Sequence, residues 1–154
     1  ASDVYKRQAV HITKSTANIS GNTISGVPYG VFVSSDAKGK IYQNTYKSGV
    51  KKKVYVGGKT SGITSKAPKI TKKSGSKTSM TVKWKKVSGA GGYEVQYSTD
   101  PKLVSGVKSV SLSAKKTSAS MKKPAAGKTY YVKVFSYKKV KGMQMYSSAK
   151  AMKL

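Results

Sequence analysis

The chain of 154 residues contains no cysteine, one histidine, one tryptophan and only four acidic residues. Without cysteine, neither a disulfide framework nor a thiolate metal site can form. No apolar run is long enough to cross a membrane or to act as the apolar region of a signal peptide, so we expect no membrane insertion. The remaining composition is 37% hydrophobic with eleven tyrosines, which is sufficient to build the core of one ordinary domain or two small ones.

The scarcity of acids leaves little material for an active site. The four acids are Asp3, Asp36, Glu94 and Asp100. Hydrolysis of a glycosidic bond requires two neighbouring carboxylates, whereas Glu94 and Asp100 are six positions apart on one strand and its following loop. Glu94 alternates with apolar neighbours, so we interpret it as a surface partner of lysine.

The other candidates for chemistry are equally weak. A catalytic triad would have to combine His11 with Asp36, and we interpret them as an exposed strand residue and a turn residue. Calcium requires several oxygen ligands, which Asp36 alone does not supply. The glycine-rich stretches at 57–60 and 89–92 have neither the spacing of a phosphate loop nor a following helix, so they are read as turns. We therefore predict no catalytic, cofactor-binding or metal-binding residue, and no cofactor.

Charge is the strongest compositional feature. Thirty-one basic residues face four acids, which gives a net charge of +27. Such a field attracts nucleic acid, acidic polysaccharide or an anionic cell wall, although a highly soluble surface explains it equally well. Arg7 is the single arginine, and base readout and bidentate phosphate contacts depend on arginine. We therefore expect anionic polysaccharide or cell wall as the partner, and no sequence-specific nucleic acid.

The N-terminal part repeats internally. The segment ISGNTI at 19–24 recurs as IYQNTY at 41–46, and GVFV at 30–33 recurs as KVYV at 53–56. Short alternating segments separated by glycine and serine, at a period of about 20–25 residues, predict a solenoid of stacked coils. A β-meander with chance turn residues is the alternative.

This repeat resembles the coils of a right-handed parallel β-helix of the pectate-lyase-like kind. The resemblance implies that Asn22 and Asn44 stack as an internal amide ladder. The side chains expected to point inward are Ile19, Ile24, Val31 and Val33 in one coil and Ile41, Tyr46, Val54 and Val56 in the next. Fewer than about three repeats do not bury a solenoid core, so we interpret residues 9–56 as the last coils of a longer β-helix. The metal-binding or basic catalytic motif that such enzymes carry on their middle coils is not visible here.

Two short segments lie outside the expected domains. Residues 1–8 read ASDVYKRQ, which resembles translated sequencing-adapter read-through, and we interpret them as a non-native leader. Residues 57–66 contain glycine, serine, threonine and lysine without hydrophobic periodicity, which is typical of a linker.

From residue 67 onward, apolar and polar residues alternate in short segments. The apolar positions of the clearest segments are Met80, Val82 and Trp84; Tyr93, Val95 and Tyr97; and Tyr130, Val132 and Val134. A last strand is expected across residues 143–152. Seven short strands with turns every 8–12 residues or so predict an antiparallel β-sandwich.

The spacing of these strands resembles the fibronectin type III domain, and the resemblance covers residues 67–154. Trp84 ends the second strand, and Tyr130 takes the place of the tyrosine-corner residue, whose hydroxyl is expected to bond backbone a few residues upstream. Pro124 stands where the family usually has a leucine that closes the end of the sandwich, so we expect the packing of that loop to depart from the family's.

One group of side chains is a candidate contact surface. Tyr131, Lys133 and Phe135 alternate with inward-facing residues, so we expect them on the outer face of a sheet. Aromatic rings beside a lysine suit the stacking of an acidic glycan. Packing of these rings against neighbouring strands or against the preceding coils is the more common arrangement.

The sequence thus predicts an all-β chain: terminal coils of a parallel β-helix at 9–56, a linker, and a seven-stranded antiparallel sandwich of the fibronectin type III kind at 67–154. We expect a monomeric, non-catalytic spacer or adhesion module of an exported bacterial protein, secreted or on the cell surface, with diffuse affinity for anionic wall polymer or glycan. The alternative is an accessory C-terminal region of a polysaccharide lyase or glycoside hydrolase whose catalytic coils are missing. Non-specific nucleic-acid binding is a third hypothesis.

Overall fold

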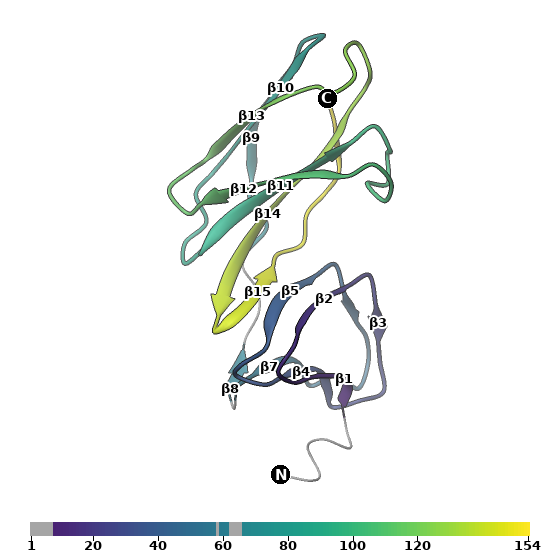
Figure 1. Ribbon diagram of the computed structural model, residues 1–154, viewed down its shortest axis with the longest axis vertical. Coiled ribbons are helices and arrows are strands. Elements are labelled where there is room, and N and C mark those ends of the chain that lie inside the picture. The colour runs from purple at the N-terminus through teal and green to yellow at the C-terminus, as the bar shows by residue number, and fades with distance from the viewer. Residues whose placement is uncertain (1–7, 58, 62–65) are drawn as a thin grey trace. The chain divides into compact units, whose positions relative to one another are not determined.

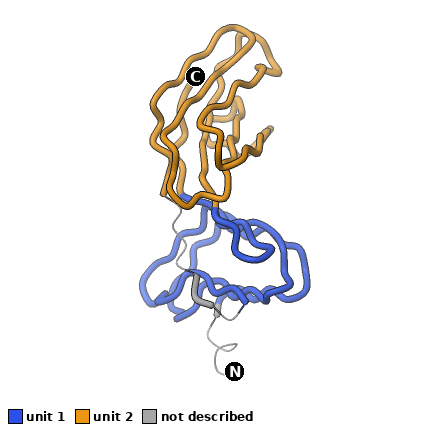
Figure 2. Tube along the Cα trace, turned by 90° about the vertical axis from the view of Figure 1, so that its left-hand side faces the viewer, with its two compact units in different colours: residues 1–64, 138–147 blue, residues 65–137, 148–154 orange. Residues whose placement is uncertain are grey.

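The computed structural model describes residues 8–57, 59–61 and 66–154, which form strands and turns without a helix, as the all-β prediction requires (Figure 1). The chain divides into two compact units (Figure 2): unit 1 comprises residues 1–64 and 138–147, and unit 2 comprises residues 65–137 and 148–154. Nearly all of the expected leader and part of the expected linker lie outside the described residues. Within those ranges no helix is found that could cross a membrane.

Unit 1 is built from short strands that pair in parallel on three sides of an apolar interior, with β8 added antiparallel to β7 (Figure 1). Its strands are β1 (Gln8–Ile12), β2 (Thr16–Ser20), β3 (Thr23–Ile24), β4 (Tyr29–Val33), β5 (Lys38–Tyr42), β6 (Thr45–Tyr46), β7 (Lys52–Val56), β8 (Lys59–Ser61) and β15 (Gly142–Tyr146). The parallel sets are β1–β4–β7, β2–β5–β15 and β3–β6. Ile19 lies opposite Ile41 and Val31 opposite Val54, so the offsets of the sequence repeat reappear as strand register.

The interior of unit 1 holds the repeated apolar positions. Its buried residues are Ile12, Ile19, Ile24, Val31, Val33, Ala37, Ile41, Val54, Val56, Met143 and Met145. They include every side chain expected to point inward except Tyr46, which is half-buried and packs against them. Burial raises the pKa of the Tyr46 hydroxyl to about 12, because the phenolate would have to form away from water.

Close stacking of successive strands requires glycine at one position. Gly39 has a φ of +140° and lies opposite Ala17 in the parallel β2–β5 pair. A Cβ atom at position 39 would lie 1.8 Å from the carbonyl oxygen of Ala17. No side chain fits there without moving backbone, so glycine permits the two strands to approach.

The structure corrects the expected course of the C-terminal strand. The segment predicted as one strand across residues 143–152 is divided between β15 in unit 1 and β16 (Met152–Lys153) in unit 2. Met143 and Met145 are fully buried in the core of unit 1, and β15 pairs in parallel with β5. The expected domain 67–154 is therefore interrupted by residues 138–147. Alternation specifies a strand with one buried face, but it does not specify which core buries that face.

Unit 2 is an antiparallel β-sandwich. Its further strands are β9 (Ile70–Gly75), β10 (Ser79–Trp84), β11 (Gly92–Ser98), β12 (Lys108–Ser113), β13 (Ser118–Lys122) and β14 (Tyr131–Val140), whose last three residues belong to unit 1. One sheet has the order β13–β10–β9, and in the other β12, β11, β14 and β16 pair in turn. Met80, Val82 and Trp84 of the first sheet share one buried cluster with Tyr93 and Val95 of the second, so the two sheets pack face to face.

The tyrosine hydroxyls of this core have partners. Tyr130 accepts a hydrogen bond of 2.9 Å from the backbone N–H of Ala125, five residues upstream, which is the contact that the resemblance implies. Tyr93 accepts one of 2.8 Å from the N–H of Val87. Trp84 packs against Tyr93 with ring centroids 5.2 Å apart, and its buried Nε1 finds no hydrogen-bond partner among the described residues.

Candidate functional surface

The structure changes the predicted aromatic contact face. Tyr131, Lys133 and Phe135 do lie on one side of β14, opposite Ser98, Gln96 and Glu94 of β11. Tyr131 and Lys133 are half-buried, however, and Phe135 is 0% exposed. The expectation that Phe135 offers an exposed ring to a ligand is therefore wrong. Alternation separates the two faces of a strand, but it does not show whether the second face is covered.

Glu94 also departs from its prediction as a surface residue. It is 3% exposed, and its Oε1 accepts a hydrogen bond of 3.0 Å from Nε2 of Gln96. Burial of a carboxylate is costly unless it is hydrogen-bonded or paired, and the amide of Gln96 meets part of this requirement. Glu94 is thus a buried member of the sheet rather than a surface residue.

The carboxylate of Asp100 organises its own loop. It accepts hydrogen bonds from the backbone N–H groups of Lys102, Val104 and Ser105 at 3.0, 2.9 and 3.0 Å. The bond from Ser105, followed by those from Lys102 and Val104, lowers the pKa of Asp100 to about 2. Such hydrogen bonds favour the charged form. A carboxylate held in this way closes a turn and is poorly suited to proton transfer.

The residues considered for a triad or metal site have local roles. His11 is exposed and meets the ring of Phe32 edge-on, with centroids 5.1 Å apart. The Ser34 hydroxyl donates to Asp36 and lowers the pKa of that carboxyl. Among the described residues no group of three or more histidine, aspartate or glutamate side chains is placed to hold a metal ion.

Asn22 and Asn44 lie one above the other in unit 1. Asn44 Oδ1 accepts hydrogen bonds from Nδ2 and from the backbone N–H of Asn22, at 3.0 and 3.1 Å. Asn44 Nδ2 donates to the carbonyl of Ile19 at 2.9 Å. The two amides therefore tie successive parallel strands together through side chains as well as backbone, which is a structural role.

The outer face of the three-stranded sheet is a solvent-exposed array of hydroxyl and ammonium groups. The alternation of β9, β10 and β13 and their register place eight side chains on this hydroxyl–lysine face: Lys72, Ser74, Ser79, Thr81, Lys83, Ser118, Ser120 and Lys122. All are exposed except Thr81, which is half-buried. Thr81 and Ser120 share a hydrogen bond of 2.9 Å across the strands. None of the eight is an acid, so the face carries positive charge alone.

Two lysines of this face are direct cross-strand neighbours. Lys72 of β9 pairs in register with Lys83 of β10. Side chains in this position have Cβ atoms roughly 4.5–5.5 Å apart, and like charges placed so destabilise a sheet by some tenths of a kcal/mol, up to about 1 kcal/mol. An anion bound between the two ammonium groups would relieve this repulsion. The pair is therefore suited to contact with a negatively charged polymer.

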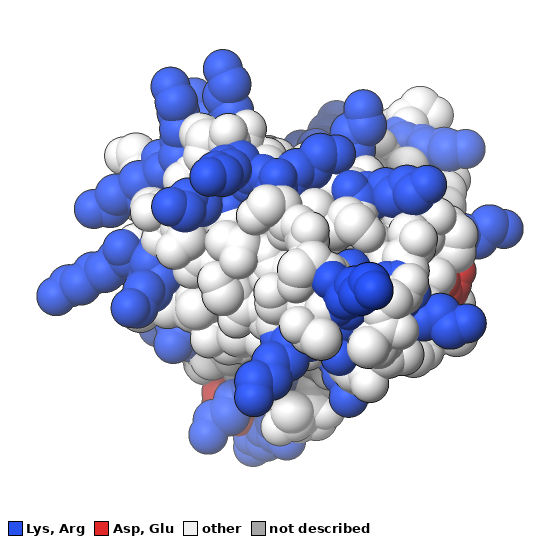
Figure 3. Space-filling model, turned by 90° about the horizontal axis from the view of Figure 1, so that it is seen from above, with Lys and Arg blue, Asp and Glu red and all other residues white. Residues whose placement is uncertain are grey.

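Lysine is also spread over the rest of the surface. Figure 3 shows lysine and arginine side chains projecting over much of one face of the molecule, with only small areas of acid. Thirty-one basic residues against four acids leave most ammonium groups without a carboxylate partner. The hydroxyl–lysine face thus lies within a broad positive field, which extends its attraction over about 8–10 Å at physiological salt.

No protein-family model and no curated protein matches the chain. Among solved structures, it is similar to the FN1–FN3 domains of chicken CNTN1, with 17% identity, a TM-score of 0.48, and coverage of 58% of this chain and 31% of that one. It is also similar to the fn3 domain of human contactin 1, with 17% identity, a TM-score of 0.47, and coverage of 58% and 76%. A third is the FN3 domain of human collagen XX, with 14% identity, a TM-score of 0.46, and coverage of 60% and 95%. The strand pairing and shared core of unit 2, rather than these similarities, define its sandwich.

Proposed function

We propose that this chain is a non-catalytic spacer and attachment module that holds anionic polysaccharide or wall polymer through lysine. The hydroxyl–lysine face carries the proposal. Lys72, Lys83 and Lys122 stand exposed on it, none of its eight residues is an acid, and serine and threonine hydroxyls lie between the lysines. Hydroxyls bond sugar hydroxyls, and ammonium groups pair with carboxylate or sulfate, so the face fits an acidic glycan.

Nearly all the basic residues are lysines rather than arginines, and this difference determines how specific the proposed binding is. An ammonium group is a hydrated point charge without the planar fork that fixes one geometry. Many weak contacts spread over a sheet produce affinity that depends on polymer length and falls steeply with salt. This behaviour suits attachment to a repetitive polymer in a wall or matrix, and it suits a secreted or cell-surface location of a bacterial protein acting as a monomer.

Each of the two units supports one part of the proposed domain organisation. Parallel pairing of β1–β4–β7, β2–β5–β15 and β3–β6 supports an interpretation of unit 1 as coils of a parallel β-helix. The three-plus-four arrangement of strands and the bond between Tyr130 and Ala125 support a fibronectin type III-like identity for unit 2. The same parallel coils favour the second candidate function, an accessory region of a polysaccharide-degrading enzyme. Carboxylates clustered on upstream coils of a longer gene would support that candidate.

A salt titration tests the proposed function. Binding of fluorescent heparin, polygalacturonate and double-stranded DNA is measured by anisotropy over a series of salt concentrations. A variant with Lys72, Lys83 and Lys122 replaced by Gln is compared with a control that loses equal charge from loops of unit 2, with Lys102, Lys128 and Lys150 replaced by Gln.

We expect the first variant to reduce the slope of log affinity against log salt by roughly two to three, because about one counterion is displaced for each lost contact. The loop control should lose much less. Equal losses in both variants would show that the face has no special role, and binding to DNA alone at moderate salt would overturn the assignment to polysaccharide.

A further inference from the structure

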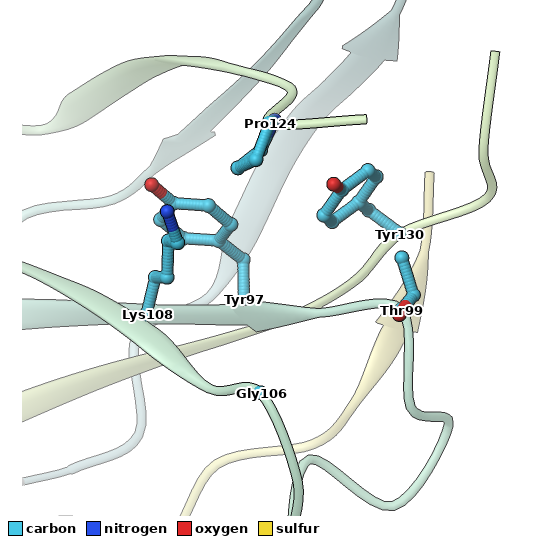
Figure 4. Close-up of a pocket in the computed structure, with 6 residues that line it drawn as sticks. All are labelled: Tyr97, Thr99, Gly106, Lys108, Pro124 and Tyr130. Carbon is cyan, nitrogen blue, oxygen red and sulfur yellow. The ribbon is translucent and has the colours of Figure 1, made fainter. Parts of the chain in front are cut away.

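One end of the sandwich of unit 2 contains a hollow of about 80 Å³. It is lined by Tyr97, Thr99, Gly106, Lys108, Pro124 and Tyr130 (Figure 4). One water molecule requires at least about 10–15 Å³ of such space, so the hollow accommodates a small polar group such as a carboxylate and the part of a ring that carries it. It is the size of a subsite for one part of a larger ligand.

An ammonium group stands on the core side of the sheet at this hollow. Lys108 begins β12, and Val110 and Leu112, which follow at two-residue spacing, both pack against the core of unit 2. Lys108 is the direct cross-strand partner of Tyr97, and both side chains line the hollow (Figure 4). No hydrogen bond or ion pair joins this ammonium to any of the described residues. The Lys108 side chain is exposed to solvent, so its ammonium is open to a ligand that enters the hollow.

Aromatic rings form the walls. The rings of Tyr97 and Tyr130 are 6.3 Å apart and tilted by 54° to one another, and both turn toward the hollow together with the ring of Pro124 (Figure 4). The hydrogen bond from Ala125 holds the Tyr130 hydroxyl in place. A second ammonium group, that of Lys123, lies 6.0 Å from the centroid of the Tyr130 ring. Pro124, on the loop before Tyr130, completes the lining on this side.

We propose that this hollow is a subsite for a uronic acid unit of the polymer that the chain binds; this inference rests on the proposed function. The carboxylate of the sugar pairs with the ammonium of Lys108, and the apolar face of the pyranose ring lies against Tyr97. The hydroxyl of Thr99 at the rim bonds a ring hydroxyl. A bare phosphate or sulfate would leave both aromatic walls unused, and the lining includes no arginine that would bind it through two bonds.

The test uses two trimers of one backbone that differ in charge. A trimer of β-1,4-linked glucuronic acid and its neutral counterpart, cellotriose, are titrated into the full chain and followed by NMR chemical shifts. The Lys108→Gln variant is compared with Lys115→Gln, which removes the same charge from an exposed turn. Tyr97→Leu removes the ring while keeping an apolar side chain, and the fluorescence of Trp84, the single tryptophan, reports whether unit 2 is folded.

We expect Lys108→Gln to lower the affinity for the acidic trimer roughly tenfold, and Tyr97→Leu to lower it by a similar factor. Lys115→Gln should change this affinity by less than about twofold. If Tyr97→Leu does not fold, the comparison of Lys108→Gln with Lys115→Gln decides whether the subsite exists. Equal effects of both lysine substitutions, or equal affinity for cellotriose, would overturn the subsite. If heparin and polygalacturonate still bound in that case, the proposed function would stand without the subsite. If neither polymers nor trimers bound, both would fail.

Discussion

Replacing Met143 and Met145 by Ala should unfold unit 1 while leaving the sandwich of unit 2 folded. Both methionines are 0% exposed, and together they are the contribution of β15 to a core of eleven buried residues. Truncation of a buried methionine to alanine costs about 2–5 kcal/mol, because apolar contacts are lost and a cavity remains. The two changes together therefore cost on the order of 4–10 kcal/mol, although neighbouring substitutions are not strictly additive.

This loss is comparable to the whole stability of a typical small domain, about 5–15 kcal/mol. Hydrogen exchange measured by mass spectrometry should show that β4, β5 and β7 of the double variant exchange far faster than in the parent chain. The midpoint of the unfolding transition reported by the fluorescence of Trp84, which lies in the core of unit 2, should not change.

Met80→Ala is the matched control, since Met80 is 1% exposed in the core of unit 2. It should lower the transition of Trp84 and leave β4, β5 and β7 protected. The reasoning would be refuted if the double variant shifted the Trp84 transition and left the exchange of β4 and β7 unchanged. Met143 and Met145 would then belong to the sandwich, as the sequence pattern alone predicts.

Three further substitutions test single features. Asn44→Ala removes two hydrogen bonds with Asn22 and one to a backbone carbonyl, so urea denaturation should show unit 1 less stable by roughly 1–3 kcal/mol. Gly39→Ala forces a Cβ into the neighbouring strand and should likewise destabilise unit 1, by at least about 1 kcal/mol. In the folded chain the pKa of Asp100 is about 2 against its usual 3.8, chiefly because the N–H of Ser105 donates a hydrogen bond to the carboxylate. The stability that the charged carboxylate contributes is therefore present above pH 4 and lost as the pH falls toward 2. Asp100→Asn should remove this dependence of stability on acid.

Each of these has its own check. Asn44→Asp keeps the acceptor and loses only the donor, so it should retain part of the stability that alanine loses. Gly21→Ala also places an alanine at a positive φ, +69°, but in open space. It therefore measures the backbone strain alone, and a loss as large as that of Gly39→Ala would contradict the role of close stacking. NMR titration of the Asp100 carboxyl measures its pKa directly, and a value near 4 would refute the loop geometry.

The sequence by itself was sufficient to predict that the repeated segments stack on one another. In parallel stacking, equivalent residues of successive strands lie above one another, so a structural repeat is visible as sequence similarity at a constant offset. Ile19 over Ile41 and Val31 over Val54 are examples. Alternation was also sufficient to assign Val82 and Tyr93 to a core, because a strand directs successive side chains to opposite faces.

The sequence did not predict that the second face of a strand is buried. Glu94 and Phe135 lie on the side of their strands opposite the sandwich core, and each was expected to be exposed, yet both are buried. The core-side position of Lys108 likewise depends on its register with Tyr97. An isolated lysine at the start of a weakly alternating strand carries no signal of the face on which it lies.

Only the tertiary structure decided which core takes the segment from 138 to 147. The alternation of Met143 and Met145 predicts a strand with one buried face, and this is what β15 is. Either core could accept methionine, which is flexible and adapts to irregular space. The choice is made by parallel pairing with β5, about a hundred residues earlier in the chain. A pairing of this kind depends on long-range geometry, and local composition and periodicity do not encode it.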